Sequence, residues 1–555
     1  MLYWKWRIWN RHPQHSVYLP NIFHHLTPMM KFHFLLCLIL WQCFASAQSD
    51  RLNTIDIQSY QFTLVINDST NVIKGEATIV VRFKKPVASF ALDLVKADRS
   101  GKGMTVDKVQ ENGKTIPFDH EEELLKVDIG STGTGETRTY LITYHGIPAD
   151  GLIIGKNKYG KRTFFGDNWP NRAHNWLPCV DHPADKAFVE FEVTAPAHYQ
   201  VVANGALMEE INLPHDAKQY LYKTAVPLPT KVMVIGAAEF AVQNIGEVSN
   251  VPLSSWVYPK DKDKGFYDYS VAKPILAYFI DHIGPYPFEK LANVQSTTRF
   301  GGMENAGNIF YYENSISGHQ DAESLIAHEI AHQWFGNSAS ETDWSQLWLS
   351  EGFATYFSDL YLEFKYGRDS LNHLLEEQRE QVIQFYRLRK TPVVDSVTTN
   401  YLDLLNPNSY QKGGWILHML RRQLGDATFW KGIRAYYAQY KLSNASTQDF
   451  MYIMEKISRK DLDTFFKQWL FTPGHPQLAI EWTQQKKNLE LMVEQKQTSA
   501  VFQFPLEVKI AYADGSSEIK MVEIARQKEV KNLKIKKKAQ VVEVVPDPNV
   551  QLLFE

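Results

Sequence analysis

The strongest constraint on this chain is a short motif that places two histidines where both can bind one metal ion. The motif reads His328-Glu329-Ile330-Ala331-His332. On a helix, residues four apart lie on the same face, so His328 and His332 can present two imidazoles to the same ion. Glu329 directly follows the first histidine and is placed to act as a general base beside the metal. This pattern is typical of the helix of a zinc hydrolase.

The residues around the motif favour a helix there over a chance match. Asp321 offers an N-cap, and a helix is predicted over residues 321–336. The third ligand is Glu351, which follows the motif after an 18-residue spacer and opens a second apolar helix at 350–366. Two histidines and one glutamate leave the fourth tetrahedral position open, as a catalytic zinc ion requires. A purely structural role is the alternative, and the paired helices argue against it.

Two further motifs make the sequence similar to a known family. The loop Gly301-Gly302-Met303-Glu304-Asn305 precedes the metal motif, and Tyr410-Gln411-Lys412-Gly413-Gly414 follows it. Together with the metal motif they resemble the gluzincin aminopeptidases of the M1 class, over roughly residues 50–475. The loop has a Gly-Gly form, and Glu304 precedes His328 by 24 residues. Both features are most similar to the branch of the family that contains the leukotriene-processing hydrolase.

The resemblance implies a role for each of these residues. One zinc ion is expected on His328, His332 and Glu351. Glu329 is expected to be the general base and acid, and Tyr410 is expected to stabilise the oxyanion. Glu304 would hold the free amine of the substrate, since a carboxylate in a buried site gains most from an ammonium partner. The remaining residues of the loop would border the substrate: Gly301, Gly302, Met303 and Asn305.

One loop departs from the family pattern. The family has a glutamine that helps to hold the free amine, and the matching position here is Trp169, with Asp167 and Asn168 beside it. Two interpretations stay open. Either Asp167 or Asn168 takes over the contact with the amine, or Trp169 forms an apolar wall of the first pocket.

The order of sequence patterns predicts a multidomain α+β protein. Short alternating runs predict an N-terminal antiparallel β domain over residues 48–250. Helical periodicity dominates residues 251–475, where the resemblance implies a thermolysin-like, mainly α catalytic domain with a small edge sheet. Strand patterns return at 476–555 and predict a small β-sandwich. The chain then ends, so the further helical domain of many family members is expected to be missing and the cleft to be more open.

The N-terminal residues predict export. Residues 1–47 are interpreted as an extension and a signal peptide that starts at Met30, with an apolar core at 32–44 and a small-residue cleavage site at 45–47. The protein is therefore expected to be periplasmic or secreted, with no stable membrane span after the signal is removed. Cys37 and Cys43 fall inside this signal, so a mature chain would hold only Cys179, which is expected to be a packed small residue.

Charge limits the possible partners. The formal net charge is −3 over 555 residues, which gives no electrostatic case for binding nucleic acid. The expected partners are peptides with a free N-terminus and a neutral first residue, and the expected state is a monomer. Two alternatives to a zinc aminopeptidase remain: a zinc hydrolase of another substrate, such as an epoxide-type or bifunctional enzyme, and a non-catalytic peptide-binding protein on the same fold.

Overall fold

The computed structural model describes residues 51–536 and 539–555, which divide into two compact units. Unit 1 extends to Val271 and includes Phe288–Leu325, and unit 2 combines Ala272–Pro287 with Ile326–Glu555. The expected signal peptide, with Cys37 and Cys43, lies outside the described residues. The expected domain boundaries at residues 250 and 475 stay predictions.

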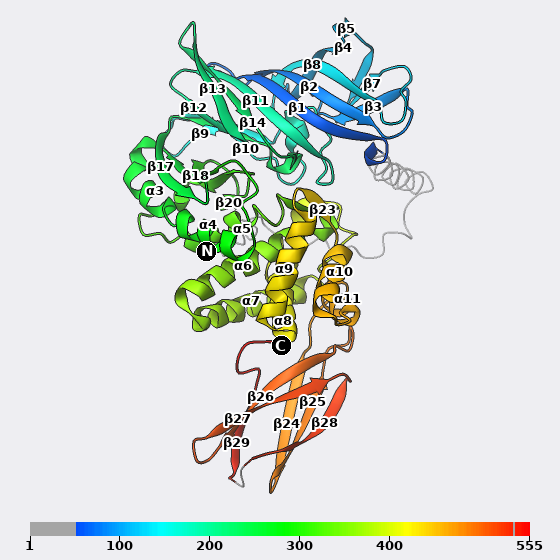
Figure 1. The fold of residues 1–555 in the computed structure, drawn as a ribbon, viewed down its shortest axis with the longest axis vertical. Coiled ribbons are helices and arrows are strands. Elements are labelled where there is room, and N and C mark those ends of the chain that lie inside the picture. The colour runs from blue at the N-terminus through cyan, green and yellow to red at the C-terminus, as the bar shows by residue number, and fades with distance from the viewer. Residues whose placement is uncertain (1–50, 537–538) are drawn as a thin grey trace, which may run out of the picture. The chain divides into compact units, whose positions relative to one another are not determined.

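The largest sheet of unit 1 has the strand order β13-β14-β11-β1-β2-β8-β4-β5, and β15 pairs with β11 (Figure 1). Its strands are β1 (Ile55–Val65), β2 (Ile73–Phe83), β4 (Gly103–Glu111), β5 (Lys114–Thr115), β8 (Thr137–Ile147), β11 (Lys186–Pro196), β13 (Ala206–Leu213), β14 (Ala217–Lys223) and β15 (Leu228–Pro229). The neighbours are antiparallel except β1 and β11, which run parallel. The expected antiparallel domain is therefore interrupted by one parallel pair, which the long connection between β1 and β11 permits.

The sequence of β1 shows how the sheet places its core. Ile55 and Ile57 are buried, and then the phase changes so that Tyr60, Phe62 and Leu64 are buried. The change of phase coincides with a register shift between Ile57 and Ser59 in the pairing with β2. A β-bulge of this kind adds one residue and returns the apolar side chains to the core face.

Three smaller sheets complete unit 1. Two of them have the orders β12-β16-β10-β9 and β3-β7-β6, and the third is a five-stranded sheet, β17-β18-β19-β21-β20. Their strands are β3 (Ser89–Asp93), β6 (Phe118–Glu121), β7 (Leu124–Asp128), β9 (Leu152–Lys156), β10 (Arg162–Gly166), β12 (Gln200–Ala203), β16 (Ile235–Ala238), β17 (Ala241–Val248), β18 (Val251–Val257), β19 (Leu291–Ser296), β20 (Gly302–Met303) and β21 (Asn308–Tyr312). The short strand β20 is an edge strand, antiparallel to β21.

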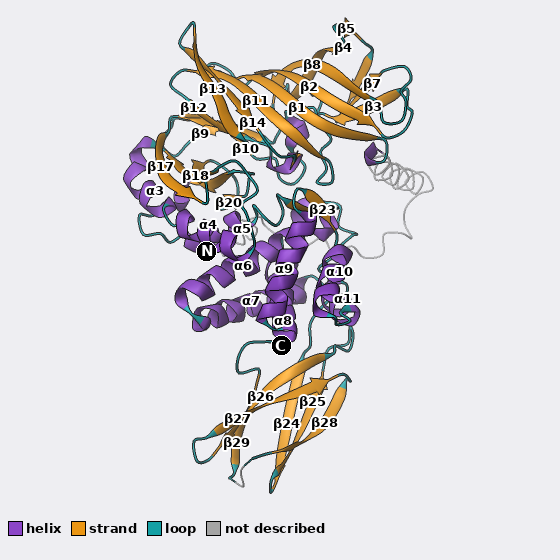
Figure 2. Cartoon of the chain, in the orientation of Figure 1, coloured by secondary structure: helices purple, strands orange, loops and turns teal. Residues whose placement is uncertain are grey.

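Among the described residues, most of the α-helices belong to unit 2 (Figure 2). They are α4 (Ala272–His282), α6 (Trp348–Tyr366), α7 (Arg368–Leu388), α8 (Gly413–Leu424), α9 (Asp426–Tyr440), α10 (Thr447–Ser458) and α11 (Asp463–Leu470). The short strands β22 (Ala339–Glu341) and β23 (Ser443–Ala445) pair in parallel. Helix α3 (Lys262–Tyr269) belongs to unit 1, and α5 (Glu323–Ala331) crosses the division at residue 325.

Two predicted helices differ from the structure. The pattern over residues 266–283 predicts one helix, whereas α3 ends at Tyr269 and α4 begins at Ala272. Pro274 in the first turn of α4 explains the break, because proline has no N–H to donate to the preceding turn. The helix predicted over 321–336 is regular only as α5, Glu323–Ala331.

The C-terminal residues form two three-stranded sheets, β24-β25-β28 and β27-β26-β29, as the predicted β-sandwich requires. The strands are β24 (Leu478–Gln485), β25 (Asn488–Gln495), β26 (Phe504–Tyr512), β27 (Ser517–Ile524), β28 (Lys528–Lys534) and β29 (Val541–Pro546). Leu489 from one sheet and Ile510, Tyr512 and Val541 from the other share a buried cluster with Ile535. Hydrophobic burial between the sheets therefore holds this part together.

Cys179 is buried and free, as expected for a packed small residue. Burial raises the pKa of its thiol well above the usual value, and the nearby carboxylates of Asp181 and Asp93 add to the rise. A thiol in this environment is a poor nucleophile at neutral pH. Among the described residues, no helix has both the length and the apolar character needed to cross a bilayer.

Asp359 is expected to make the stability of unit 2 depend on pH. It is buried on α6, accepts a hydrogen bond from Gln378 Nε2 of α7 at 2.8 Å, and burial raises its pKa to about 7. The folded state therefore keeps a proton that the unfolded state has already released. This proton stabilises the folded state at low pH, and the stabilisation is lost as the pH rises through the folded pKa. The free energy of unfolding falls by at most about 4 kcal/mol over this range.

The measurement is denaturant unfolding of the wild type and of Asp359→Asn at about pH 5 and about pH 8. The variant cannot ionise, so its free energy of unfolding relative to the wild type is expected to improve at the higher pH. Asp281→Asn is the matched control, because its side chain is 83% exposed. A relative stability of Asp359→Asn that is independent of pH would contradict the expectation.

Candidate active site

The three expected metal ligands meet in unit 2, where α5 and α6 place them. His328 Nε2 and His332 Nε2 are 3.1 Å apart. Glu351 Oε2 lies 3.3 Å from each of these nitrogens. All three residues are at most 2% exposed. Two imidazole nitrogens and one carboxylate oxygen thus form a small, buried triangle.

This triangle fits a zinc ion. Ligand atoms at about 2.0–2.1 Å from a tetrahedral zinc ion are about 3.3–3.4 Å apart. The observed edges of 3.1–3.3 Å are close to that spacing. The set of donors, two nitrogens and one oxygen, is also one that zinc accepts in catalytic sites. Within the part of the chain that the structure describes, His328, His332 and Glu351 are therefore fitted to hold the single zinc ion.

The end of α5 positions His332. The helix ends at Ala331, but the backbone N–H of His332 still donates to His328 O at 3.2 Å. Its side chain therefore stays one turn beyond His328, as the predicted helix required. Gly336, with φ +114°, then turns the chain away from the helix. A Cβ at this glycine would lie 2.2 Å from Ser350 Oγ, so a larger residue would have to displace the Ser350 side chain.

The contacts of His332 also determine which of its two ring nitrogens carries the proton. Nδ1 lies 3.2 Å from the backbone oxygen of Phe335 and 3.1 Å from Ser350 Oγ. A carbonyl oxygen only accepts, so Nδ1 carries the proton and donates it there. Nε2 is then left with a lone pair directed towards the metal position. Hydrogen bonds of this type orient a metal ligand and raise its basicity.

Ser350→Ala is expected to weaken zinc binding without abolishing it. The substitution removes one of the two oxygens that contact His332 Nδ1, and the Phe335 carbonyl remains. Loss of such an outer contact costs about ten-fold to 100-fold in metal affinity, and the lower end is expected here. Competition with a fluorescent zinc chelator measures the change. Ser358→Ala is the control, since Ser358 is buried on the same helix and donates to Thr355 O. An unchanged affinity in Ser350→Ala would contradict this role.

Glu329 lies beside this metal site. It is fully buried, and one of its oxygens is within 4.8 Å of a ring nitrogen of His332. The residue follows His328 directly, so its side chain leaves the helix on an adjacent face. A carboxylate at this position is close to the ion without belonging to the triangle of ligands.

Tyr410 is brought to the metal ligands by close packing of two elements. It belongs to a π-helical turn, Asn408–Lys412, and its ring stacks on that of His328 with centroids 6.0 Å apart and 14° between planes. Helix α6 packs tightly against this turn and the start of α8: a Cβ on Gly352 would lie 3.1 Å from Ser409 O and 2.8 Å from the Cα of Gly413. The two glycines therefore allow the backbones to approach. Single π-helical turns are rare in proteins, and those that occur are often found at functional sites.

The sequence alone does not identify the close packing of these two glycines. Gly352 directly follows the ligand Glu351, and Gly413 belongs to the tyrosine motif. A glycine in a helix allows the backbone of another helix to come close. The sequence does not show that Gly352 and Gly413 face each other. In the same motif, Lys412 is buried and donates to Gly474 O at 2.7 Å, and burial lowers its pKa to about 7.

The expected substrate loop belongs to unit 1. Gly302 and Met303 form the edge strand β20, and Glu304 and Asn305 follow it with exposures of 3% and 0%. The backbone turns back into β21 at this point, where Asn308 N donates to Asn305 O at 3.0 Å. Gly301 is at the start of the loop, and its carbonyl accepts from Tyr312 N at 3.0 Å. The loop is thus a hairpin at the edge of the five-stranded sheet.

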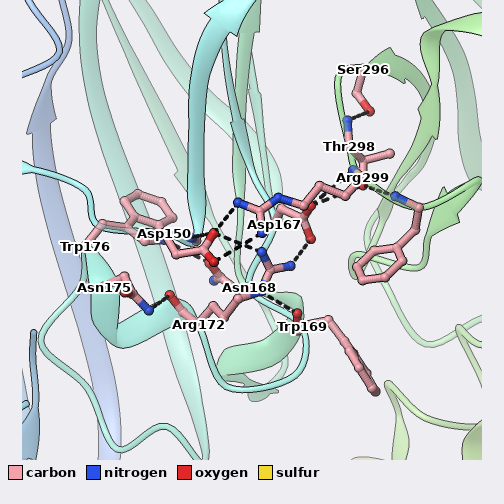
Figure 3. A network of polar contacts seen from close by, with 12 residues as sticks. Asp150, Asp167, Asn168, Trp169, Arg172, Asn175, Trp176, Ser296, Thr298 and Arg299 are labelled. Carbon is pink, nitrogen blue, oxygen red and sulfur yellow. Dashed lines mark hydrogen bonds and ion pairs between the residues drawn. The ribbon is translucent and has the colours of Figure 1, made fainter. Parts of the chain in front are cut away.

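The loop with Asp167, Asn168 and Trp169 is also in unit 1, and its polar groups have internal partners (Figure 3). Asp167 Oδ1 accepts from Arg172 Nη2 at 2.6 Å. Asn168 donates to the carbonyls of Thr230 and Met233 and accepts from the Trp176 indole. Trp169 is 2% exposed and packs edge-on against Phe300. Asp167 and Asn168 therefore already serve the structure of unit 1.

Comparison with known proteins agrees with this fold. The sequence model of the Peptidase M1 N-terminal domain matches residues 57–232, and that of the Peptidase family M1 domain matches residues 267–469. "Probable aminopeptidase 2" of Sulfurisphaera tokodaii is 28% identical over 483 residues, covering 82% of this chain and 59% of that protein. Human "Glutamyl aminopeptidase" is 29% identical over 391 residues, covering 66% of this chain and 40% of that protein. This chain thus spans less than two thirds of the length of both relatives.

A solved structure supports the fold. The crystal structure of an M1 zinc metallopeptidase from Deinococcus radiodurans superposes with a TM-score of 0.65 and 23% sequence identity, over 76% of this chain and 96% of that one. The likeness confirms the expected order of a β-rich N-terminal part, a mainly helical part and C-terminal sheets. With two family models matched in succession and the His328–His332–Glu351 ligand set formed, this chain belongs to peptidase family M1.

Proposed function

We propose that this protein is a zinc aminopeptidase that removes the first residue from peptides with a free N-terminus. The observation that carries the proposal is the buried triangle of His328, His332 and Glu351, with edges of 3.1–3.3 Å, next to Glu329 and Tyr410. When bound there, a zinc ion supplies a water with a pKa near neutrality and a Lewis acid for the scissile carbonyl.

The protein's own residues supply the proton transfer and the stabilisation of charge. Glu329 takes a proton from the attacking water and hands it to the departing amine. Its complete burial supports this role, since a carboxylate shielded from bulk water exchanges protons only with groups inside the site. The Tyr410 hydroxyl donates a hydrogen bond to the oxyanion of the tetrahedral intermediate. The stacking of its ring on His328 holds the phenol on the metal side of the π-helical turn.

The N-terminal end of the substrate is proposed to bind to the Gly301–Asn305 hairpin of unit 1. Glu304 binds the N-terminal ammonium, and its exposure of only 3% makes the resulting charge-assisted hydrogen bonds strong. The edge strand β20 offers backbone groups to an extended peptide, which adds to it as a further strand. The apolar packing of Trp169 on Phe300 supports a neutral first residue. We also propose that the protein is exported and monomeric, with the mature N-terminus near Gln48.

The test is the release of a chromophore from unblocked and N-acetylated aminoacyl substrates, with and without a chelator. Only the unblocked substrates should be cleaved, and the chelator should stop the reaction until zinc is restored. Cleavage of the blocked substrates would instead indicate an endopeptidase. No cleavage of either by zinc-loaded protein would favour a non-catalytic peptide-binding protein. Cleavage only of an epoxide substrate would favour the other class of zinc hydrolase.

Glu304→Ala is expected to lower kcat/KM on unblocked substrates by about 10-fold to 100-fold, the value of one charge-assisted contact. The bound zinc should stay at the wild-type level, because His328, His332 and Glu351 are intact. Steady-state kinetics and metal analysis on the same preparation measure both quantities. Glu304→Gln is the matched variant, since it keeps the size and removes the charge. A loss of zinc that parallels the loss of activity would contradict the assigned role.

A further inference from the structure

Four charged side chains of unit 1 form an alternating network (Figure 3). One of them, Arg299, precedes by two residues the hairpin that carries Glu304. Asp150 Oδ1 accepts from Arg172 Nη1 at 3.0 Å, and Asp167 Oδ1 accepts from Arg172 Nη2 at 2.6 Å. Arg299 donates through both terminal nitrogens to Asp150, at 2.7 and 3.2 Å. Two arginines and two aspartates therefore balance in charge, and Asp150 is shared by both arginines.

The network joins two segments that are far apart in the sequence. One segment is residues 150–172, around β9 and β10, and the other is residues 296–300, which lead directly into Gly301. Asp167 Oδ2 also lies 3.3 Å from the backbone N–H of Arg299 and 3.4 Å from Thr298 Oγ1. These two contacts are long for hydrogen bonds. The two-pronged contact of Arg299 with Asp150 is shorter, at 2.7 and 3.2 Å, and joins two charged groups, so we assign it more of the attachment.

The two halves of the network differ in burial and therefore in energetic weight. Asp167 is fully buried, and the Arg172 side chain is 10% exposed. Removing one partner of such a pair leaves a buried charge and is strongly destabilising. Arg299 is 57% exposed and Asp150 is 29% exposed, and an ion pair at such an exposed position contributes little to stability. The buried pair Arg172–Asp167 is thus needed for the stability of unit 1. The exposed pair Arg299–Asp150 can be removed without unfolding it.

Two further observations place the attachment at the base of the hairpin. Trp169 packs edge-on against Phe300, with ring centroids 6.3 Å apart, so the same two segments also meet through apolar side chains. Thr298 continues the chain of contacts: its N–H donates to Ser296 Oγ at 3.2 Å. Burial alone would raise the pKa of Asp150, but Arg172 and Arg299 outweigh it and the pKa lies below the usual value. Asp150 is therefore ionised at neutral pH, as the network requires.

We infer that the Asp150–Arg172–Asp167–Arg299 network positions the base of the Gly301–Asn305 hairpin, so that Glu304 is held where it meets the ammonium of the substrate. The inference rests on the proposed aminopeptidase function. It gives Asp167 the role of a positioning residue, because its oxygens are engaged by Arg172, Thr298 and Arg299. Arg299 can be substituted without unfolding unit 1, and its side chain affects substrate binding only through the position of the hairpin.

The test uses the full-length, zinc-loaded protein and the variants Arg299→Ala and Asp150→Asn. A displaced amine anchor should raise KM for unblocked substrates by about ten-fold, since small displacements of a binding group are costly. kcat per bound zinc should stay near the wild-type value. Arg299→Lys keeps the charge but not the two-pronged geometry, so it should restore KM only in part. Combining Arg299→Ala with Asp150→Asn should raise KM little beyond the Asp150→Asn value, because both variants break the Arg299–Asp150 ion pair.

Lys161→Ala is the matched control. It removes an exposed ion pair of unit 1, Lys161 with Glu239, whose side chains are 59% and 36% exposed, and it should leave KM unchanged. Amide hydrogen exchange over residues 297–305 gives a second readout that does not depend on turnover. Exchange there should be faster in Arg299→Ala and Asp150→Asn than in the wild type and in Lys161→Ala.

The outcomes separate this inference from the proposed function. If the wild type cleaves unblocked substrates and Arg299→Ala keeps the wild-type KM, the inference is wrong and the function stands. A lower kcat per zinc with an unchanged KM would show a general structural role and would also overturn it. If the zinc-loaded wild type cleaves nothing, the proposed function fails and the inference fails with it.

Discussion

Glu329→Gln is expected to lower kcat by about 10²-fold to 10⁴-fold, the usual contribution of a positioned general base, while the protein still binds one zinc ion. Glutamine has the same shape as glutamate but cannot accept the proton of the attacking water. The three metal ligands are unchanged, and Glu329 is not a member of their triangle. KM should therefore change much less than kcat.

Steady-state kinetics on unblocked substrates, together with metal analysis, measure this effect. Glu323→Gln is a matched control, because it makes the same isosteric change in the first turn of the same helix, at a residue that is 8% exposed. The control should turn over at close to the wild-type rate. Wild-type kcat in zinc-loaded Glu329→Gln protein would remove Glu329 from the mechanism.

Tyr410→Phe is expected to lower kcat by about 10²-fold to 10³-fold, the value of one donor to an oxyanion. The phenyl ring keeps the stacking on His328, at 6.0 Å between centroids, so zinc content and KM should remain close to the wild type. The lost quantity is the hydrogen bond that forms only as charge develops on the carbonyl oxygen.

Tyr401→Phe provides the comparison for this variant. Tyr401 stacks on Trp344 in the same unit, with centroids 5.3 Å apart, and is not part of the tyrosine motif. Its activity should be close to that of the wild type. An equal loss in both variants would show that the phenyl substitution disturbs packing and that Tyr410 has no separate role.

The fold was predictable where a periodic pattern is long. Apolar periodicity over residues 350–366 and 369–388 predicts two long helices, and the structure has them as α6, Trp348–Tyr366, and α7, Arg368–Leu388. Each pattern extends over several turns, so the apolar face is well defined. Shorter or mixed patterns were less informative. Strand β28, Lys528–Lys534, was not predicted, since lysines alternate with its few apolar residues and the strand resembles a solvated charged segment.

The candidate site was predictable to different degrees in its parts. His328 and His332 are related by one helical turn, which backbone hydrogen bonds set independently of the rest of the protein. Asp167 illustrates the limit: its sequence position allowed contact with the substrate amine, and the structure shows its carboxylate engaged by Arg172. Arg299 was not singled out, because no pattern in the sequence relates it to Asp150, 149 residues earlier.

The sequence by itself determined the chemistry of the metal site: which residue types bind, their spacing within the helix, and the base beside them. Those properties follow from local helix geometry. Only the tertiary structure decided that Glu351 comes within 3.3 Å of both histidines and that Tyr410 stacks on His328. These distances depend on how closely helices approach, which is set by packing at Gly336, Gly352 and Gly413, where a missing side chain matters only once its neighbour is known.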